Sequence, residues 1–344
     1  MSIDTPALSG PRAVVLGCAG EELRADERQF FAEANPAGFI LFRRNCRAPD
    51  RVRRLVEDLR DSIGRDDAPV LIDQEGGRVA RLRPPCWRAY PSAGQITALP
   101  DPLAEEAARL TARLIADDLG RLGITVDCMP VLDLAVSGAD PVIGDRSYSS
   151  DPDRVAVLGR AACEGLLEGG VLPVLKHIPG HGRARVDSHY ACPIIETERA
   201  ELSRTDFAPF RALAAMPWAM TAHIVYHAID SISPATLSRR VISEVIRGEI
   251  GFQGVLISDD LSMRALGGSL GERTSQALAA GCDLALHCSG DRREMEEVIA
   301  SAAAVTTETA ARLARDESLR RSPGEFDRAA AERRLDTLLA GTSA

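Results

Sequence analysis

Short apolar runs of strand length alternate along the chain with longer amphipathic segments. The runs are apolar on both sides of the pleat, as expected for parallel strands buried on both faces. Strands are predicted over residues 13–17, 38–42, 69–73, 123–134, 171–177, 218–224, 254–258 and 282–288. Amphipathic helices are predicted between them, for example over 49–63, 104–122, 152–170 and 292–316.

Eight strands that alternate with helices predict an α/β fold, a single-domain (β/α)8 TIM barrel covering residues 1–344. A doubly wound open sheet is the alternative. However, no GxGxxG motif follows the first strand, and no linker rich in Pro, Gly or Ser divides the chain. From about residue 317 the chain is expected to form a C-terminal helical tail on the surface, with a frayed end.

The composition is typical of a globular protein, with 45% hydrophobic and 26% charged residues. It excludes a disordered, fibrous or membrane-spanning chain. The net charge of -9 argues against a nucleic-acid partner, and no membrane partner is expected. The segment 1–12 lacks the features of a secretion signal, so a cytoplasmic location is expected. The eight cysteines are scattered without a CxxC motif, which agrees with a reducing compartment and does not favour a zinc site.

Lysine occurs once in the chain, at position 176, and the other 40 of its 41 basic residues are arginine. An ammonium and a guanidinium differ in size, fork geometry and hydration, so they do not interchange at a tight polar site. Retention of one lysine in an arginine-rich chain therefore indicates a functional role for Lys176, although chance under this compositional bias is the alternative.

Polar residues gather where the predicted strands end. The stretches are 73-DQEGGRV-79, 144-GDRSY-148, 176-KHIPGHGRARVDSH-189, 221-TAH-223 and 258-SDDLS-262. In a barrel the C-terminal ends of the strands converge on one mouth, where such enzymes place their sites. We therefore expect a site built from several loops at this mouth.

Two pairs of residues suit acid–base or nucleophilic chemistry. Neighbouring strand residues face opposite sides, so at most one of Asp259 and Asp260 points into the mouth, while the other accepts hydrogen bonds or caps a helix. Asp187 and His189 are two positions apart and can lie on one side, so that the carboxylate orients the imidazole as a general acid/base. The alternative for Asp259 and Asp260 is that both cap the following helix. The alternative for Asp187 and His189 is that they belong to a solvated loop without a function.

The remaining polar residues leave alternatives open. Asp73 suits a pair of sugar hydroxyls or an internal ion pair with Arg78. Arg146 suits a substrate hydroxyl or carboxylate, or a surface ion pair with Asp145 or Asp151. The histidines do not form an HxH or HExxH motif, so no bound metal is expected. For His181 and His287, a buried, hydrogen-bonded histidine is expected.

These motifs together resemble those of glycoside hydrolase family 3 and, more narrowly, of its NagZ-type β-N-acetylhexosaminidases. The pairing of KHxPGHG…DSH with SDDLSM is highly specific, and the implied barrel accounts for essentially the whole chain. The matching stretches follow the family's order and are 38-GFILFRRN-45, 71-LIDQEGGRVARL-82, 142-VIGDRSY-148, 176-KHIPGHG-182, 187-DSH-189, 221-TAH-223 and 257-ISDDLSM-263.

The resemblance implies a retaining, two-step hydrolysis that needs no cofactor and no metal. Asp259 would be the nucleophile and His189 the general acid/base, with Asp187 orienting it. This scheme departs from the two carboxylates of most glycosidases. The resemblance implies that the sugar is bound by Asp73, Arg146, Lys176 and His177. Residues expected to support these side chains without binding the sugar directly are Asp260, His223 and Arg78.

The implied substrate is a terminal β-linked N-acetylglucosamine on a muropeptide fragment, GlcNAc-1,6-anhydro-MurNAc with or without its peptide, and the implied process is peptidoglycan recycling by a monomer. Alternatives are a β-glucosidase or a phosphorylase of the same family, an inactive sugar-binding barrel and a metal-dependent barrel hydrolase. The DSH motif argues against the glucosidase, and the retained Asp259 argues against the inactive protein. The loop 182–189 is expected to be the most mobile part of the mouth.

Overall fold

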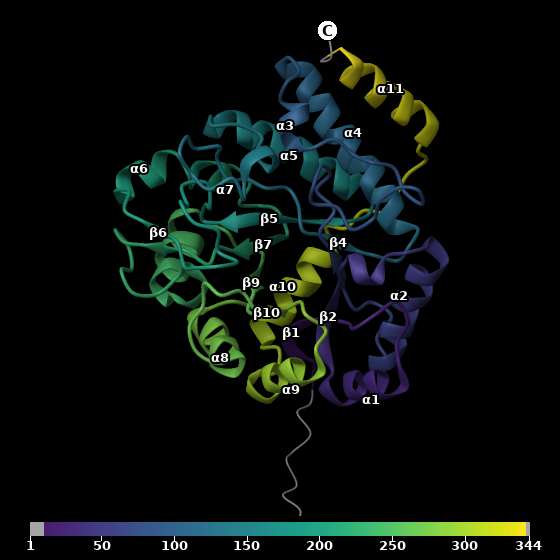
Figure 1. Cartoon of the computed structure of the whole chain (residues 1–344), viewed down its shortest axis with the longest axis vertical. Coiled ribbons are helices and arrows are strands. Elements are labelled where there is room, and N and C mark those ends of the chain that lie inside the picture. Colours follow the sequence, from purple (N-terminus) through teal and green to yellow (C-terminus); the bar gives the residue numbers. More distant parts are fainter. Residues whose placement is uncertain (1–9, 342–344) are drawn as a thin grey trace, which may run out of the picture.

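A closed barrel of eight parallel strands forms the centre of the computed structural model, which describes residues 10–341 (Figure 1). Because neighbouring strands follow chain order and the last pairs with the first, the predicted (β/α)8 barrel is confirmed and the open sheet is excluded. In barrel order the strands are β1 (Arg12–Gly17), β2 (Pro36–Leu41), β3 (Val70–Ile72), β4 (Val126–Asp127), β5 (Leu172–Ile178), β7 (Trp218–Thr221), β9 (Val255–Asp260) and β10 (Leu284–His287).

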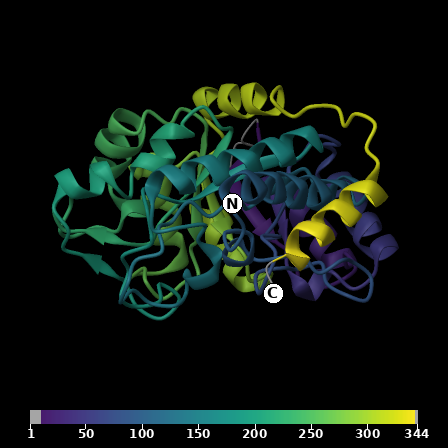
Figure 2. The ribbon, with the colours of Figure 1, turned by 90° about the horizontal axis from the view of Figure 1, so that it is seen from above.

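Helices cover the outside of the barrel (Figures 1 and 2). They are α1 (Ala25–Ala34), α2 (Pro49–Ile63), α3 (Ala93–Ile96), α4 (Asp101–Gly120), α5 (Pro152–Glu168), α6 (Arg199–Arg204), α7 (Ala208–Ala212), α8 (Leu270–Ala280), α9 (Arg292–Ser301), α10 (Thr307–Glu317) and α11 (Arg328–Ala340). Single 3-10 turns occur at η1 (Arg43–Asn45), η2 (Gly144–Arg146) and η3 (Ala235–Leu237), and η4 (Val241–Glu249) is a π-helix. Two short strands, β6 (Ile194–Ile195) and β8 (Val225–Tyr226), pair outside the barrel.

Local sequence signals set several helix ends. Helix α2 begins with Pro49, whose missing N–H costs nothing in a first turn, and ends at Gly64 in the left-handed conformation. The side chain of Asp151 accepts the N–H of Asp153 and caps α5. Ser269 caps α8 in the same way. These residues fix where each helix leaves the barrel wall.

The core has two layers because successive strand residues face opposite sides. In β1, for example, Ala13 and Val15 belong to the apolar cluster that fills the barrel. Val14 and Leu16 belong to the larger cluster between the strands and the helices. Both faces of each strand are therefore buried, which explains the continuous apolar runs in the sequence.

Two predicted elements differ from the structure. The long strand predicted over 123–134 was wrong, since only Val126–Asp127 pairs as β4. Pro130 has no N–H to donate to a ladder, and beyond it the chain keeps only an isolated bridge, from Val131 to Lys176 of β5. The single helix predicted over 292–316 was also wrong. It is divided into α9 and α10, because Ala304 pairs with Arg12 of β1 and Thr306 caps a new helix.

The C-terminal tail returns to the body of the molecule. A long connection leads from α10 to α11, which lies beside α4 (Figures 1 and 2). Arg328 of α11 is 2.7 Å from Asp117 and 2.8 Å from Asp118 at the end of α4. Most of the segment 1–12, judged not to be a secretion signal, and the last three residues lie outside the described residues.

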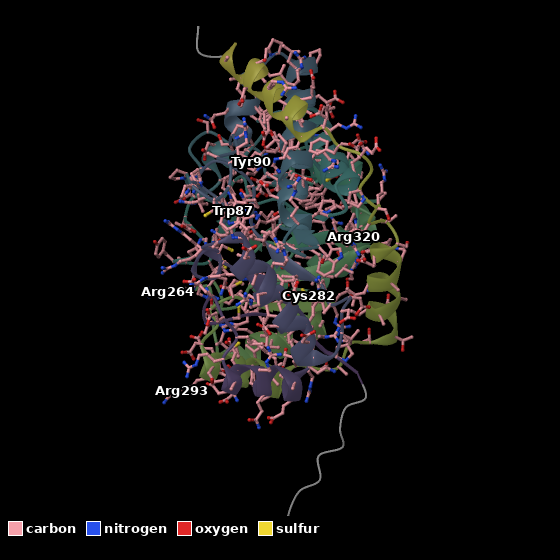
Figure 3. The ribbon with its side chains drawn as sticks, turned by 90° about the vertical axis from the view of Figure 1, so that its right-hand side faces the viewer. Trp87, Tyr90, Arg264, Cys282, Arg293 and Arg320 are labelled. Atoms are coloured by element: carbon pink, nitrogen blue, oxygen red, sulfur yellow. The ribbon has the colours of Figure 1, made fainter. Side chains whose placement is uncertain are left out.

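Residues 10–341 contain no helix with the length and apolarity that a membrane crossing requires. Figure 3 shows Trp87 and Arg264 on one side of the molecule and Arg320 on the other. Trp87 follows β3 in the chain and Arg264 follows β9, so the carboxyl ends of these strands open toward the same side. The barrel mouth is therefore formed by the loops on that side.

Candidate active site

Strand geometry places three of the predicted residues at the top of the barrel interior. Asp73, Lys176 and Asp259 come from β3, β5 and β9 or the position that follows them. The side chain two positions earlier in each case belongs to the apolar cluster that fills the barrel. Side chains two apart face the same side of a strand. The three polar residues therefore continue the inward-facing rows and end them at the mouth.

Lys176 is at the centre of a buried network of charges. Its Nζ atom is 2.8 Å from Asp73 Oδ1 and 2.6 Å from Glu75 Oε1. Arg146 donates two hydrogen bonds of 2.8 Å to the Glu75 carboxylate, and Arg81 donates one of 2.9 Å to Asp73. Three cations thus surround two carboxylates, and Lys176 is only 2% exposed. The ion pairs considered from the sequence differ, because Glu75 is the partner of Arg146 and Arg81 is a partner of Asp73.

The charges of this network stabilise one another. Burial would raise the pKa of Glu75, but Arg146 and Lys176 lower it to about 2. Burial would also raise the pKa of Asp73, but Lys176 and Arg81 lower it. Burial would lower the pKa of Lys176, and the two carboxylates raise it. The network is therefore ionised near neutral pH and offers charged donors and acceptors to the hydroxyl groups of a ligand.

A second buried carboxylate orients His177. Asp133 is fully buried, and its Oδ1 accepts the backbone N–H of His177 at 3.1 Å and that of His181 at 2.6 Å. Its Oδ2 is 2.7 Å from Nδ1 of His177. Burial would raise the pKa of Asp133, but His177 lowers it. The ionised carboxylate holds the proton on Nδ1, which leaves Nε2 of His177 available to a ligand.

The two aspartates at the end of β9 have different surroundings. Asp259 Oδ1 accepts the backbone N–H of Asp260 at 2.8 Å. Burial would raise the pKa of Asp259, but His223, His177 and this hydrogen bond lower it. Asp260 accepts the hydroxyl of Ser262 at 2.6 Å and its N–H at 3.1 Å, which closes the turn after the strand. Asp259 is therefore the ionised group that is available to a ligand.

His223 supports the end of β9 from outside the cavity. Its Nδ1 is 2.7 Å from the Thr236 hydroxyl, and its Nε2 is 3.0 Å from the carbonyl oxygen of Asp260. Burial lowers the pKa of His223, so the imidazole is neutral and its Nε2–H donates to that carbonyl. This contact fixes the backbone next to Asp259.

The predicted Asp187–His189 pair forms on the loop after β5. Asp187 Oδ1 is 2.7 Å from Nδ1 of His189 and also accepts the backbone N–H of His189 at 2.9 Å. Burial would raise the pKa of Asp187, but these hydrogen bonds lower it. The His189 side chain is 61% exposed, so it can approach and leave a ligand. With Nδ1 held by Asp187, Nε2 is the nitrogen that can exchange a proton.

These groups share one cavity of about 270 Å³. Its polar lining includes Asp73, Arg146, Lys176, His177, His189 and Asp259. Its apolar lining includes Ile40, Phe42, Met220, Met263 and Leu286. A mainly polar cavity with an apolar wall can bind the hydroxyl groups of a sugar and pack against the face of its ring. Asp259, His189 and the predicted sugar-binding side chains therefore come together at the mouth, and Asp187 is connected to the cavity through His189.

Arg78 lies at the rim of the cavity. Its Nε is 3.0 Å from Asp145 Oδ1, and its Nη2 donates to the carbonyl of Pro141 at 3.0 Å. Both side chains of the ion pair are about half exposed. Arg78 therefore holds the loop that carries Arg146 and does not pair with Asp73.

The sequence analysis did not identify three residues of the site, Glu75, Arg81 and Asp133. A signal for Glu75 was present, because it stands two positions after Asp73 in the DQEGG motif. Asp133 stands in a run that was interpreted as strand. Within residues 10–341, no three His, Cys, Asp or Glu side chains are grouped as they would be to hold a metal ion.

Acidification is expected to destabilise the fold through His181. This residue is 3% exposed, and burial lowers its pKa to about 4, from 6.5 in the unfolded chain. The unfolded state therefore binds more protons between pH 6.5 and 4, so the free energy of unfolding falls as the pH is lowered through this window. Between pH 7 and 4 the wild type should lose roughly 3 kcal/mol more than His181→Gln. Urea unfolding at several pH values measures this difference, and parallel pH profiles would contradict the assignment.

Comparisons with known proteins agree with this geometry. The model of the glycosyl hydrolase family 3 N-terminal domain matches residues 10–321. A protein of Alkalilimnicola ehrlichii named beta-hexosaminidase is 39% identical over 288 residues, which are 82% of this chain and 81% of that protein. A beta-hexosaminidase of Pseudomonas aeruginosa is 38% identical over 84% of this chain and 86% of its own length.

Solved structures give the same result. NagZ of Neisseria gonorrhoeae in complex with N-trifluoroacetyl-D-glucosamine superposes with a TM-score of 0.85 and is 30% identical. The match covers 97% of this chain and 99% of that structure. The family match spans the whole barrel, from β1 to beyond α10. The chain therefore belongs to glycosyl hydrolase family 3, which confirms the resemblance seen in its motifs.

Proposed function

We propose that this glycoside hydrolase removes terminal β-linked N-acetylglucosamine from muropeptide fragments, with retention of configuration and through a covalent glycosyl-enzyme. The observation that carries the proposal is that Asp259 and His189 line one cavity together with the charged network of Lys176. The relatives named beta-hexosaminidase support an amino sugar as substrate. The ligand of the Neisseria gonorrhoeae structure, an N-acylated glucosamine, supports it as well.

In the first step Asp259 attacks C1 of the sugar. A bond forms between its carboxylate oxygen and C1 while the bond from C1 to the leaving oxygen breaks. Nε2–H of His189 gives its proton to that oxygen, so that the alcohol leaves neutral. The lowered pKa of Asp259 favours this step because the nucleophile is already an anion.

In the second step water resolves the glycosyl-enzyme. Its oxygen attacks C1, its proton passes to Nε2 of His189, and the bond between C1 and Asp259 breaks. The Asp259 carboxylate and the protonated His189 are thereby restored. His189 is therefore the imidazolium when the first step begins and the neutral imidazole when water attacks in the second. Asp187 stabilises the imidazolium form by its 2.7 Å contact with Nδ1.

Sugar recognition is assigned to the charged network and to His177. The Asp73 carboxylate and the Lys176 ammonium bind adjacent hydroxyls, Arg146 donates a further hydrogen bond, and Nε2 of His177 completes the set. Because these donors and acceptors are already ordered by Glu75 and Asp133, little side-chain entropy is lost when the sugar binds.

The specific substrate in this proposal is GlcNAc-1,6-anhydro-MurNAc, with or without its peptide. The role in peptidoglycan recycling in the cytoplasm, as a monomer, is part of the same proposal and is supported by the family resemblance. Incubation with this disaccharide and its peptide forms, followed by mass spectrometry, should show release of N-acetylglucosamine. Failure on the disaccharide with continued turnover of aryl glycosides would remove the muropeptide from the proposal.

The decisive test compares two aryl glycosides. The wild type should release 4-nitrophenol from the N-acetyl-β-D-glucosaminide, and at least about a hundredfold more slowly from the β-D-glucoside, because the pocket must bind the acetamido group. Proton NMR during the reaction should show β-N-acetylglucosamine as the first product. Equal turnover of both glycosides would favour a β-glucosidase, and an α product would exclude retention.

A phosphorylase is the second candidate, favoured by the histidine acid/base. A neutral imidazole does not repel phosphate as a carboxylate does, so phosphate could replace water in the second step. Addition of phosphate to the aryl glycoside assay distinguishes the two. We expect free N-acetylglucosamine with and without phosphate, whereas a phosphate-dependent rate and a sugar 1-phosphate product would establish the phosphorylase.

A further inference from the structure

Ser188 stands between the two residues of the acid/base pair but faces the opposite way. The side chains of Asp187 and His189 are 23% and 61% exposed, whereas Ser188 is 2% exposed. Its hydroxyl oxygen is 3.1 Å from Nε2 of His181. The loop that carries the acid/base is therefore attached to the protein interior at the residue between the pair.

His181 is itself held at two points. Its backbone N–H donates to Asp133 Oδ1 at 2.6 Å, and its ring lies 5.5 Å from the ring of His177 with an angle of 61° between the planes. Asp133 is also the carboxylate that orients His177. A single buried aspartate therefore fixes both the histidine assigned to the sugar and the histidine that contacts the loop.

Two further contacts confine the ends of this loop. The carbonyl of Ser188 accepts the N–H of Ala265, which follows β9. At the other end Gly182 lies so close to Leu134 that a Cβ would meet the Leu134 carbonyl oxygen at 2.1 Å. Both ends of the loop thus contact the backbone of other segments, and the hydrogen bond between Ser188 and His181 joins these two ends.

We propose that His181 and Ser188 are positioning residues that set the place of Asp187 and His189 over the cavity and connect them to the sugar-binding His177. This inference rests on the proposed function, because it assigns a purpose to the loop only if His189 is the acid/base. The imidazole of His181 is neutral at working pH, so the contact is a hydrogen bond between uncharged groups. Neither His181 nor Ser188 is among the residues that line the cavity, so their role is positioning and not catalytic.

Loss of this contact should affect only the proton transfer. A general acid must reach the leaving oxygen within hydrogen-bond distance, and small displacements of a catalytic group cost large factors in rate. A leaving group that departs without protonation does not need His189 in the first step. The dependence of the rate on the leaving group therefore separates a displaced acid from a damaged site.

The experiment measures kcat/KM for Ser188→Ala with two N-acetyl-β-glucosaminides. The phenyl glycoside needs protonation of its leaving oxygen, and the 2,4-dinitrophenyl glycoside does not. We expect a loss of about tenfold on the phenyl glycoside and less than about twofold on the dinitrophenyl glycoside. His181→Gln should give the same selective loss, and it tests the contact independently if the serine variant folds poorly.

A double-mutant cycle provides the second readout. In a His189→Ala background, Ser188→Ala should have no further effect on the phenyl glycoside, because the residue through which Ser188 acts is gone. Arg185→Ala is the matched control, since Arg185 is an exposed residue of the same loop, and its activity should equal that of the wild type. Thermal unfolding of each variant verifies the fold.

Equal losses on both glycosides, or no loss on either, would overturn the positioning role. Additive losses in the double mutant would overturn it as well, because Ser188 would then act independently of His189. If the wild type hydrolyses neither glycoside, the proposed function fails, and this outcome is distinct from a failure of the Ser188 inference alone.

Discussion

Replacement of Asp259 by alanine is expected to lower kcat for N-acetyl-β-glucosaminides by roughly 10⁴-fold or more. The variant lacks the oxygen that bonds to C1, and no other carboxylate of β9 can replace it, because Asp260 is engaged with Ser262. Release of 4-nitrophenol measures the loss. The fold should persist, since the removed group lies at the end of the barrel and supports no neighbouring strand through its side chain.

Reaction with azide tests the role of Asp259 independently of the decrease in kcat. In Asp259→Ala, azide can enter the vacated space and attack C1 of an activated glycoside, which would give the α-glycosyl azide. In His189→Ala the glycosyl-enzyme still forms, and azide should attack it from the other face to give the β-glycosyl azide. NMR distinguishes the products. Activity of Asp259→Ala within tenfold of the wild type would show that another residue is the nucleophile.

The fold could be predicted because each barrel strand is recognisable from its own short run of apolar residues. Each barrel strand is apolar on both faces. Lys176 and Asp259 face the barrel interior, as do the apolar residues two positions before them. The phase of two residues then places any polar side chain at the end of such a strand inside the mouth. The prediction from the sequence therefore identified residues that the structure brings into one cavity.

What could not be predicted depends on contacts between distant segments. Asp133 is 44 residues away from the His177 that it orients, and nothing in its own neighbourhood differs from a buried strand. The partner of Arg146 could not be chosen between nearby aspartates and Glu75, which is 71 residues away. Likewise, the break between α9 and α10 follows from pairing of Ala304 with β1 at the opposite end of the chain.

The site separates enclosed charges from an exposed acid. Lys176 is buried, Asp73 and Glu75 are largely enclosed, and the three side chains hold one another in place, so the sugar meets a preordered surface. His189, by contrast, is exposed and reaches the cavity from a loop. This division suits a two-step reaction, because the sugar must stay in place while the acid/base gives a proton, admits water and takes a proton back.

Replacement of Lys176 by arginine is expected to lower kcat/KM by roughly 10²- to 10³-fold, although the positive charge is kept. Nζ of Lys176 occupies a point between two carboxylates, at 2.8 and 2.6 Å, in a site that is 2% exposed. The longer, planar guanidinium does not fit that point, and Asp73 must move away from the sugar to accommodate it. Aryl glycoside kinetics measure the loss, and near-wild-type turnover would contradict a special role for this single lysine.

Lys176→Met separates the charge of the lysine from its shape. Removal of the ammonium leaves Asp73 and Glu75 with one cation fewer, so this variant should lose about 3–5 kcal/mol of stability, as found when one partner of a buried ion pair is deleted. Lys176→Arg should lose only about 1–3 kcal/mol, from overpacking. Arg293→Lys, the reverse exchange at an exposed position of α9, is the matched control and should change neither property. Urea unfolding measures both losses, and equal stability of the two Lys176 variants would mean that the charge of the ammonium does not hold the site together.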